Sequence, residues 1–323
     1  MIRARIALLA VAVLAVVSAC GSGDADPSAT GTSPAGSPPA SSPPSTSAST
    51  SAAPSSTSSA AASSSGGTAA GTPAGTPSAP GASTPPSGTG ALWRPEQGTS
   101  WQYQLSSTLD LSVDAAVYDV DWEDTSAAQV AQLHAAGRRV ICYVNAGAYE
   151  DWRPDAQDYP GEVLGEPLDG WPGERWLDIR RTDLLLPLLA ARLDVCRAKG
   201  FDAVEADNVD GYANDTGFPL TAQDQLTFNT AVARLAQERG MSVGLKNDVE
   251  QVAELEPDFD FAVNEECVTY DECGEYAPFL DAGKAVLHVE YENAPSGRCA
   301  TVSKNAMSTI LKFPELGPDL RHC

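Results

Sequence analysis

Between residues 93 and 323, short apolar segments alternate with polar loops and amphipathic helices, and this alternation restricts the fold more than any other feature. Eight segments have the length and apolar character of buried strands: 101–105, 115–121, 140–145, 175–179, 202–207, 242–247, 259–265 and 284–291. Helices are expected over 126–136, 182–199, 222–239, 249–255, 276–282 and 299–311. Strands that alternate with helices form a parallel sheet, and eight strands close a (β/α)8 barrel. We therefore predict an α/β fold, a single (β/α)8 TIM barrel, with an open sheet of six or seven strands as the alternative.

Residues 21–92 have a different composition from the rest of the chain. These 72 residues are almost all Ser, Ala, Pro, Gly and Thr, and their only charged side chains are Asp24 and Asp26. A segment with so few large apolar side chains cannot bury a core, so we predict a disordered linker. A flexible chain of this length spans on average about 45–50 Å. Residues 93–323 then form one globular domain that is large enough for a barrel.

Residues 1–20 have the pattern of an export signal. Arg3 and Arg5 precede an apolar stretch over 6–17, which is too short to span a bilayer. The stretch ends in Val-Ser-Ala-Cys at 17–20, which resembles a bacterial lipobox, and we predict lipidation at Cys20. The domain is then expected on the extracellular face of the bacterial cell membrane, in contact with lipid only through the anchor. Secretion after cleavage of an ordinary signal peptide is the alternative.

The charge balance restricts the possible partners. The chain has 20 Lys and Arg against 43 Asp and Glu, a net charge of −23, and residues 93–323 carry the whole of this excess. Such a domain repels the phosphates of nucleic acid and anionic lipid, and it favours neutral or cationic partners. Only three histidines are present, which argues against a metal centre built from several histidines. We expect a monomer without a cofactor or a metal ion.

Six cysteines follow Cys20, and an even number in an exported domain predicts three disulfides. Six cysteines allow fifteen pairings, and those we favour are Cys142–Cys196, Cys267–Cys273 and Cys299–Cys323. The first pairing has a geometric basis. Cys196 lies on the apolar face of helix 182–199, and Cys142 alternates with Tyr143 along its strand and so faces the helices.

Polar side chains end nearly every predicted strand. Barrel enzymes carry their catalytic groups at this end of the strands, where eight loops converge. For any one residue the simpler interpretation is a solvated strand end, but a ring of carboxylates with Trp, Tyr, Asn and Lys is typical of a sugar site. The predicted substrate-binding residues are Asp119, Asp121, Tyr143, Asn145, Glu150, Asp178, Asn208, Asp210, Lys246, Asn247, Glu290 and Tyr291.

Glycoside hydrolysis commonly needs two carboxyl groups that flank the scissile bond. Asp207 and Glu265 are the best pair because each ends an apolar strand near the middle of the sheet, with Asp210 and Glu266 as alternatives. Glu205 shares the face of Asp207 one layer deeper, and a nearby anion raises the pKa of a carboxyl group.

Other chemistries fit less well. The sequence has no Gly-x-Ser-x-Gly nucleophile motif and no glycine-rich phosphate loop after a predicted strand. Lys246 could form a Schiff base in a barrel, but a lysine that contacts sugar or an ion pair is the favoured interpretation.

Together these residues resemble glycoside hydrolase family 114. The resemblance covers nearly all of 93–317, and the motifs that carry it are WQYQL at 101–105, YVNAGAYE at 143–150, WLD at 176–178, DNVD at 207–210 and NEEC at 264–267. The characterised members are endo-α-1,4-polygalactosaminidases with a TIM-barrel fold. The resemblance therefore implies internal cleavage of an α-1,4-linked galactosamine polymer with retention. By motif it implies Asp207 as nucleophile and Glu265 as general acid/base.

A cationic amino-sugar polysaccharide would also fit the acidic charge of the domain. We expect five of the predicted residues to surround the entrance and attract ammonium groups: Asp119, Asp121, Glu150, Asp178 and Glu290. Solubility is an equally good explanation of the total charge. The alternative functions are a glycan-binding lipoprotein without catalysis and a hydrolase of another α-linked cell-wall glycan.

Overall fold

The computed structural model describes residues 92–291 and 306–322. The export signal, Cys20, the linker up to residue 91, Cys299 and Cys323 lie outside the described residues. Within the described part, no helix combines the length and the apolar character that a membrane span requires.

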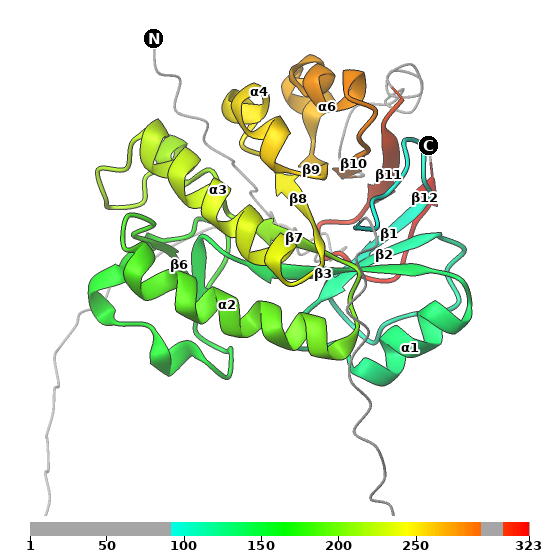
Figure 1. Ribbon diagram of the computed structural model, residues 1–323, viewed down its shortest axis with the longest axis horizontal. Coiled ribbons are helices and arrows are strands. Elements are labelled where there is room, and N and C mark those ends of the chain that lie inside the picture. The colour runs from blue at the N-terminus through cyan, green and yellow to red at the C-terminus, as the bar shows by residue number, and fades with distance from the viewer. Residues whose placement is uncertain (1–91, 292–305, 323) are drawn as a thin grey trace, which may run out of the picture. The chain divides into compact units, whose positions relative to one another are not determined.

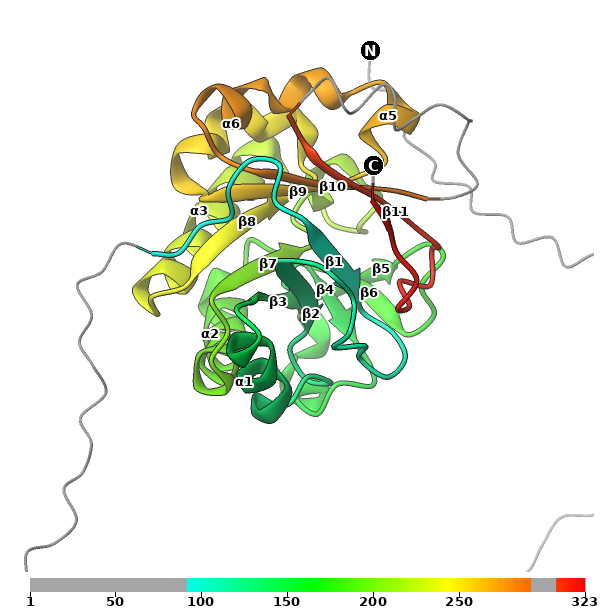
Figure 2. The same ribbon diagram turned by 90° about the vertical axis from the view of Figure 1, so that its right-hand side faces the viewer.

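A nine-stranded sheet forms the centre of the domain (Figure 1). Its spatial order is β1 Trp101–Gln104, β2 Val117–Asp121, β3 Arg139–Asn145, β7 Ala203–Asp207, β8 Ser242–Lys246, β9 Phe261–Glu265, β10 Val286–Tyr291, β11 Ser308–Lys312 and β12 Arg321–His322. The first eight strands pair in parallel, and β12 pairs antiparallel with β11. The eight parallel strands curve into a nearly closed barrel (Figure 2), which confirms the predicted (β/α)8 fold.

Two of the predicted elements were wrong. The segment predicted as the fourth barrel strand is β6 Glu174–Leu177, which pairs antiparallel with β4 Ala148–Glu150 and β5 Leu164–Pro167 in a separate sheet. The eighth barrel strand is β11, in a segment predicted as helix 299–311. A strand of a parallel barrel is covered on both faces, and β11 is buried at nearly every position. Such a strand has no alternation that would distinguish it from a buried helix.

Helices cover the outer face of the barrel (Figure 2). They are α1 Ala127–Ala135, α2 Thr182–Lys199, α3 Ala222–Glu238, α4 Val252–Leu255, α5 Cys267–Tyr270 and α6 Ala277–Asp281. Short 3-10 turns lie at Ala156–Asp158, Gly161–Val163, Gly211–Ala213, Val249–Gln251, Glu256–Asp258 and Cys273–Tyr276. Ser126 forms a capping box with Gln129 at the start of α1, and Gly200 closes α2 in the left-handed conformation with φ 94°.

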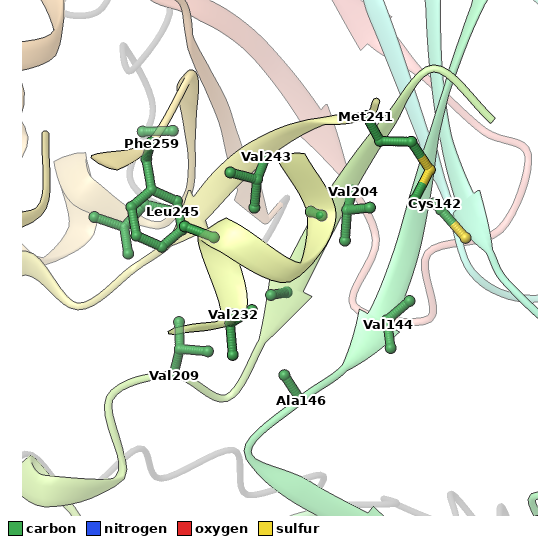
Figure 3. Close-up of a cluster of buried hydrophobic side chains, with 14 of the residues drawn as sticks. Cys142, Val144, Ala146, Val204, Val209, Val232, Met241, Val243, Leu245 and Phe259 are labelled. Atoms are coloured by element: carbon green, nitrogen blue, oxygen red, sulfur yellow. The ribbon is translucent and has the colours of Figure 1, made fainter. Parts of the chain in front are cut away.

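The sheet separates two apolar cores. The outer core lies between strands and helices, and Figure 3 shows Val144 of β3, Val204 of β7 and Val243 of β8 in this layer with Val232 of α3. The inner core fills one end of the barrel and includes Phe261. Gly244 is required there, since a Cβ atom at this position would lie 2.4 Å from the Phe261 ring. The other end of the barrel contains polar side chains.

Side chains and a following segment complete the barrel between its first and last parallel strands. The Trp101 indole of β1 donates to the Ser308 carbonyl of β11 at 2.7 Å. The Lys312 ammonium of β11 donates to Gln102 Oε1 of β1 at 2.9 Å. Residues 314–318 follow β11 and extend this contact, because the Leu316 carbonyl accepts the backbone N–H groups of residues 105 and 106 at 3.0 and 3.2 Å.

The structure contains two of the predicted disulfides, Cys142–Cys196 and Cys267–Cys273. Cys142 of β3 points outward to Cys196 on the buried face of α2, as its alternation with Tyr143 predicted. The third predicted pairing, Cys299–Cys323, lies outside the described residues.

We expect the two disulfides to differ in their contribution to stability. They join residues 54 and 6 positions apart, so removal of Cys142–Cys196 frees a much longer loop of the unfolded chain. Loop entropy predicts a loss of about 4 kcal/mol for the Cys142→Ala/Cys196→Ala variant and about 2 kcal/mol for Cys267→Ala/Cys273→Ala. Urea unfolding of both variants measures the difference, and an equal loss or the reverse order would contradict this prediction.

Candidate active site

A cavity of about 790 Å³ opens at the carboxyl ends of the parallel strands. Its lining includes Tyr143 from β3, Asp207 from β7, Lys246 from β8, Glu265 from β9 and Tyr291 from β10. Loops after the strands extend the wall, and so does the segment over 314–316 that follows β11. The cavity is therefore where barrel enzymes perform catalysis.

Lys246 occupies the centre of the polar end of the barrel. Its ammonium nitrogen lies 2.9 Å from Glu205 Oε1, 3.0 Å from Asp207 Oδ1 and 3.6 Å from Glu265 Oε2. Burial alone would lower the pKa of Lys246, but these carboxylates raise it well above its usual range, and the side chain stays charged. A permanently protonated amine is a poor Schiff-base nucleophile, so Lys246 is an ion-pairing residue, as favoured from the sequence.

Asp207 and Glu265 each receive a second polar contact. The Tyr143 hydroxyl donates to Asp207 Oδ2 at 2.7 Å, and the Tyr291 hydroxyl donates to Glu265 Oε1. Burial opposes the ionisation of Asp207, but the Lys246 ammonium and the Tyr143 hydroxyl lower the pKa of Asp207 below its usual value. Asp207 is therefore a carboxylate at neutral pH. The pKa of Asp207 is lowered although Glu205 lies nearby, because Lys246 contacts both carboxylates.

The backbone turns sharply after Asp207, Lys246 and Glu265. Asn208, Asn247 and Glu266 all have a left-handed conformation, with φ of 57°, 47° and 63°. Such a residue ends the strand, and outside Gly, Asn and Asp it is uncommon. Glu266 leaves the sheet at this turn and does not line the cavity, whereas Glu265 does. The geometry thus brings Glu265, and not Glu266, next to Asp207 and Lys246.

A close approach of two backbones fixes the position of Asp207. The N–H groups of Ala146 and Gly147 both donate to the Asp207 carbonyl at 3.1 Å. A Cβ atom at Gly147 would lie 1.7 Å from the Asn208 carbonyl oxygen, so no side chain fits there. Gly147 therefore allows the loop after β3 to hold the end of β7.

Two buried carboxyl groups lie beneath the cavity. Glu205 Oε1 accepts from Lys246 and from the Tyr103 hydroxyl, the latter at 3.0 Å. Asp119 is fully buried, and neither of its oxygens has a hydrogen-bond donor among the described residues. Burial and the Glu205 charge raise the pKa of Asp119 well above its usual value. Asp119 therefore lies beneath the cavity and not at its entrance.

The cavity brings together most of the predicted binding residues. Those that line it are Asp121, Tyr143, Glu150, Asn208, Asp210, Lys246, Asn247 and Tyr291. Asp119, Asn145, Asp178 and Glu290, which were also predicted to bind substrate, are not among the lining residues. The Asn145 amide instead donates to Glu174 at 3.0 Å, Asp178 pairs with Arg180 at 2.7 Å, and Glu290 accepts the Val268 N–H at 2.8 Å.

The five acids expected to attract ammonium groups do not surround the entrance. Their exposed fractions are 0% for Asp119, 6% for Asp121, 2% for Glu150, 7% for Asp178 and 0% for Glu290. Arg153 donates to both Asp121 and Glu150 at 2.6 Å, and Arg192 of α2 adds a second ion pair to Glu150. The exposed acids that line the cavity are instead Asp124, Glu166, Asp169, Asp215 and Glu315.

Several residues that line the cavity were not predicted from the sequence as binding residues. They lie in the segment between β3 and α2 that forms the small sheet, and they are Trp152, Arg153, Glu166, Asp169, Trp171, Glu174 and Trp176. Three of the six tryptophans of the chain fall within 152–176, and this density was the available signal. Burial and the charges of Glu150 and Asp207 raise the pKa of Glu174 to about 8. Burial and Asp207 raise the pKa of Asp210 to about 6.

Glu174 should make the fold less stable as the pH rises. The folded protein holds this proton to about pH 8, whereas an unfolded glutamate releases it near 4.5, so the stabilisation is lost between these values. We expect the stability advantage of Glu174→Gln over the wild type to grow by roughly 2–4 kcal/mol between pH 5 and pH 8. Urea unfolding of both proteins at the two pH values measures this change. The shift attributed to Glu174 would be wrong if the difference stayed constant.

One group of side chains in the described ranges has the composition of a metal site. Potential ligand atoms of Cys267, Cys273 and His288 lie within 4.8 Å of one another. Both cysteines are joined in a disulfide, so they supply no thiolate for a metal ion.

The sequence matches the model of glycoside-hydrolase family GH114 over residues 82–323. Among solved structures, the crystal structure of Aspergillus fumigatus Ega3 in complex with galactosamine is similar, with 39% sequence identity and a TM-score of 0.67. This match covers 74% of the present chain and 100% of the Ega3 chain.

A more distant structure shares the fold. The glycoside hydrolase domain of PelA from Pseudomonas aeruginosa has 14% identity and a TM-score of 0.55, with 69% of this chain and 98% of that chain covered. Among proteins with curated descriptions, none matches the sequence.

Proposed function

Because the chain belongs to glycoside-hydrolase family GH114, we propose that it cleaves an α-1,4-linked, galactosamine-containing polysaccharide internally, by a retaining mechanism with two carboxyl groups. In this proposal Asp207 is the nucleophile and Glu265 is the general acid/base. The alternatives are catalysis on another α-linked glycan and glycan binding without catalysis.

The observation that carries the mechanism is the position of Lys246 between the two carboxylates. Its nitrogen lies 3.0 Å from Asp207 Oδ1 and 3.6 Å from Glu265 Oε2, so these oxygens are at most 6.6 Å apart, the sum of the two distances. Retaining glycosidases have their carboxyl groups ~5–5.5 Å apart, and inverting ones ~6.5–9.5 Å apart. This upper bound on the distance between the two carboxylate oxygens favours retention. An inverting enzyme needs a wider separation, because a water molecule must fit between its catalytic base and the sugar.

The contacts of Asp207 fit its proposed role as nucleophile. Asp207 is kept ionised by Lys246 and Tyr143, so one of its oxygens can bond to the anomeric carbon as the glycosidic C–O bond breaks. Glu265 gives its proton to the leaving oxygen. In the second step Glu265 accepts a proton from water, the water oxygen bonds to the anomeric carbon, and Asp207 is released as a carboxylate.

The proposed substrate class is a cationic amino sugar. Ega3 was crystallised with galactosamine, whose ammonium group is positive near neutral pH. In the present cavity Asp124, Glu166, Asp169 and Asp215 are exposed and can interact with such groups. An opposite charge in a partly desolvated cavity favours the cation over a neutral N-acetylated sugar.

A reducing-end assay tests the proposal. The purified protein should release new reducing ends from partly deacetylated α-1,4-linked galactosaminogalactan and not from neutral α-glucans, and the first products should have the α configuration by NMR. Cleavage of another α-glycan alone would favour the second candidate. Binding without new reducing ends would favour the third.

We further propose that the domain is exported and attached through Cys20. The basis is the sequence of residues 1–20 and the disulfides in the folded domain, which are typical of oxidising compartments. Membrane fractionation tests this, because Cys20→Ala should move the protein from the membrane to the soluble fraction. An unchanged distribution would disprove lipidation at this residue.

A further inference from the structure

Two tryptophans are exposed inside the proposed active-site cavity. Among the described residues the exposed large hydrophobic side chains are Trp152 and Trp171, each 54% exposed, with Tyr270 and Phe313. Trp152 and Trp171 line the cavity that contains Asp207 and Glu265, whereas Tyr270 and Phe313 do not. A half-exposed indole leaves a large apolar surface in contact with water, which favours a ligand that covers it.

Both tryptophans lie in the insertion between β3 and α2. Trp152 follows β4, and Trp171 lies in the turn that connects β5 to β6. This turn is closed by hydrogen bonds from the Trp171 N–H to the Leu168 carbonyl and from the Glu174 N–H to the Trp171 carbonyl, both at 3.1 Å. Trp171 is therefore held by backbone hydrogen bonds.

The two tryptophans belong to one continuous surface. The Asp151 N–H donates to the Gly173 carbonyl at 3.1 Å, which joins the segment of Trp152 to the turn of Trp171. A Cβ atom at Gly173 would lie 3.0 Å from the Trp152 ring, so this ring packs against the base of the turn. We refer to the surface formed by Trp152, Glu166, Asp169 and Trp171 as the insertion wall.

Acidic side chains accompany the indole rings. Glu166 and Asp169 of the wall are exposed and line the cavity. The Glu166 N–H donates to the Thr216 carbonyl at 2.9 Å, which places the neighbouring Asp215, also exposed and lining the cavity, beside the wall. Apolar ring faces next to carboxylates match the chemistry of an amino sugar, which has an apolar C–H face and an ammonium group.

We propose that the insertion wall is a subsite for galactosamine units of the polymer that lie outside the pair of sugars flanking the scissile bond. Trp152 and Trp171 stack on the pyranose rings and attract the ammonium groups through their π faces, and Glu166, Asp169 and Asp215 pair with these groups. This inference rests on the proposed function, and it adds the place on the enzyme at which the polysaccharide binds. It explains how the enzyme would prefer the interior of a long chain to its ends.

The inference predicts that the affinity for long oligomers depends on the two indole rings. The test uses the Glu265→Gln variant, which should bind without cleavage, and α-1,4-linked galactosamine oligomers of about two to eight units. Isothermal titration calorimetry gives Kd for each length. Adding Trp152→Ala and Trp171→Ala should weaken binding of the longest oligomer about tenfold or more, and that of the shortest much less.

Two companion variants distinguish stacking from a structural effect. Trp152→Phe/Trp171→Phe in the same background keeps a ring face and should retain most of the affinity. Phe313→Ala removes an exposed ring that does not line the cavity, and should bind all lengths as the Glu265→Gln parent does. A loss that is the same for every oligomer length would disprove the subsite.

The inference and the proposed function fail differently. Suppose the wild type cleaves the polymer and the Glu265→Gln variant binds it, but the double alanine variant has unchanged Kd values at every length. The subsite is then wrong, and the proposed function remains. Suppose instead that the wild type cleaves no galactosamine polymer and the Glu265→Gln variant binds no oligomer. Both proposals are then overturned.

Discussion

Replacing Asp207 with Asn or Glu265 with Gln is expected to lower kcat by roughly a thousandfold or more. Each substitution preserves the size of the side chain and removes one chemical role. The Asp207→Asn variant lacks the negative oxygen that bonds to the anomeric carbon, and the Glu265→Gln variant has no carboxyl group that could transfer a proton. Initial rates of reducing-end release from galactosaminogalactan measure the loss, and circular dichroism confirms that both variants fold.

The two roles are separated by a substrate with a good leaving group. An α-galactosaminyl fluoride needs no proton on its leaving group, so Glu265→Gln should still form the glycosyl-enzyme, and added azide should release it as the α-azide. Asp207→Asn should remain inactive toward the fluoride by this route. Release of the α-azide by Asp207→Asn alone would indicate that the roles are exchanged, whereas a β-azide from this variant would show that azide replaces the missing nucleophile.

Matched controls come from carboxylates outside the cavity. Glu266→Gln changes the residue next to Glu265, and Asp194→Asn changes an exposed residue of α2 that pairs with Arg239. Both variants should keep nearly the wild-type rate. Normal turnover by both Asp207→Asn and Glu265→Gln would disprove the site assignment.

Replacing Lys246 with Met is expected to destabilise the fold by about 3–5 kcal/mol. Lys246 is 2% exposed and is the counter-ion for Glu205, which is fully buried. Its removal leaves Glu205 and Asp207 without a compensating cation in a partly desolvated site. The loss of unfolding free energy will be smaller if Glu205 and Asp207 take up protons. Urea unfolding of the variant and the wild type at pH 5 and pH 8 measures this loss at each pH.

The same variant should alter the pH dependence of catalysis. Lys246 helps to lower the pKa of Asp207, so without it Asp207 ionises only at higher pH. The acidic limb of kcat/KM should therefore move to higher pH. Lys284→Met is a suitable control, because Lys284 pairs with Glu256 at 2.6 Å and does not line the cavity. An unchanged acidic limb in Lys246→Met would show that Lys246 does not control the ionisation of Asp207.

The positions of Asp207, Lys246 and Glu265 could be inferred from the sequence because each ends a short apolar strand. The sequence of β6 has the same local appearance, and it was therefore assigned to the barrel. What distinguishes β6 from β11 is the partner strand, and pairing partners are not encoded in a local hydrophobic pattern. The number of barrel strands was right, although one predicted member was wrong.

The depth of each acidic side chain could not be predicted. Strand alternation indicates the face on which Asp119 or Asp121 lies, but not its distance from solvent. The neutralising cations also come from elsewhere in the chain. Arg153 lies in a loop and Arg192 on α2, 42 residues after Glu150. The pairing of these arginines with the acidic side chains follows from the fold and could not be predicted from the local sequence.

The segment over 314–316 completes the cavity late in the sequence. These three residues line the cavity, and all other lining residues precede them in the sequence. The Leu316 carbonyl also accepts the N–H groups of Leu105 and Ser106, more than two hundred positions earlier. A growing chain thus synthesises both proposed catalytic carboxylates well before the wall of their cavity is complete. The complete cavity therefore requires residue 316 to be made and to reach the segment that follows β1.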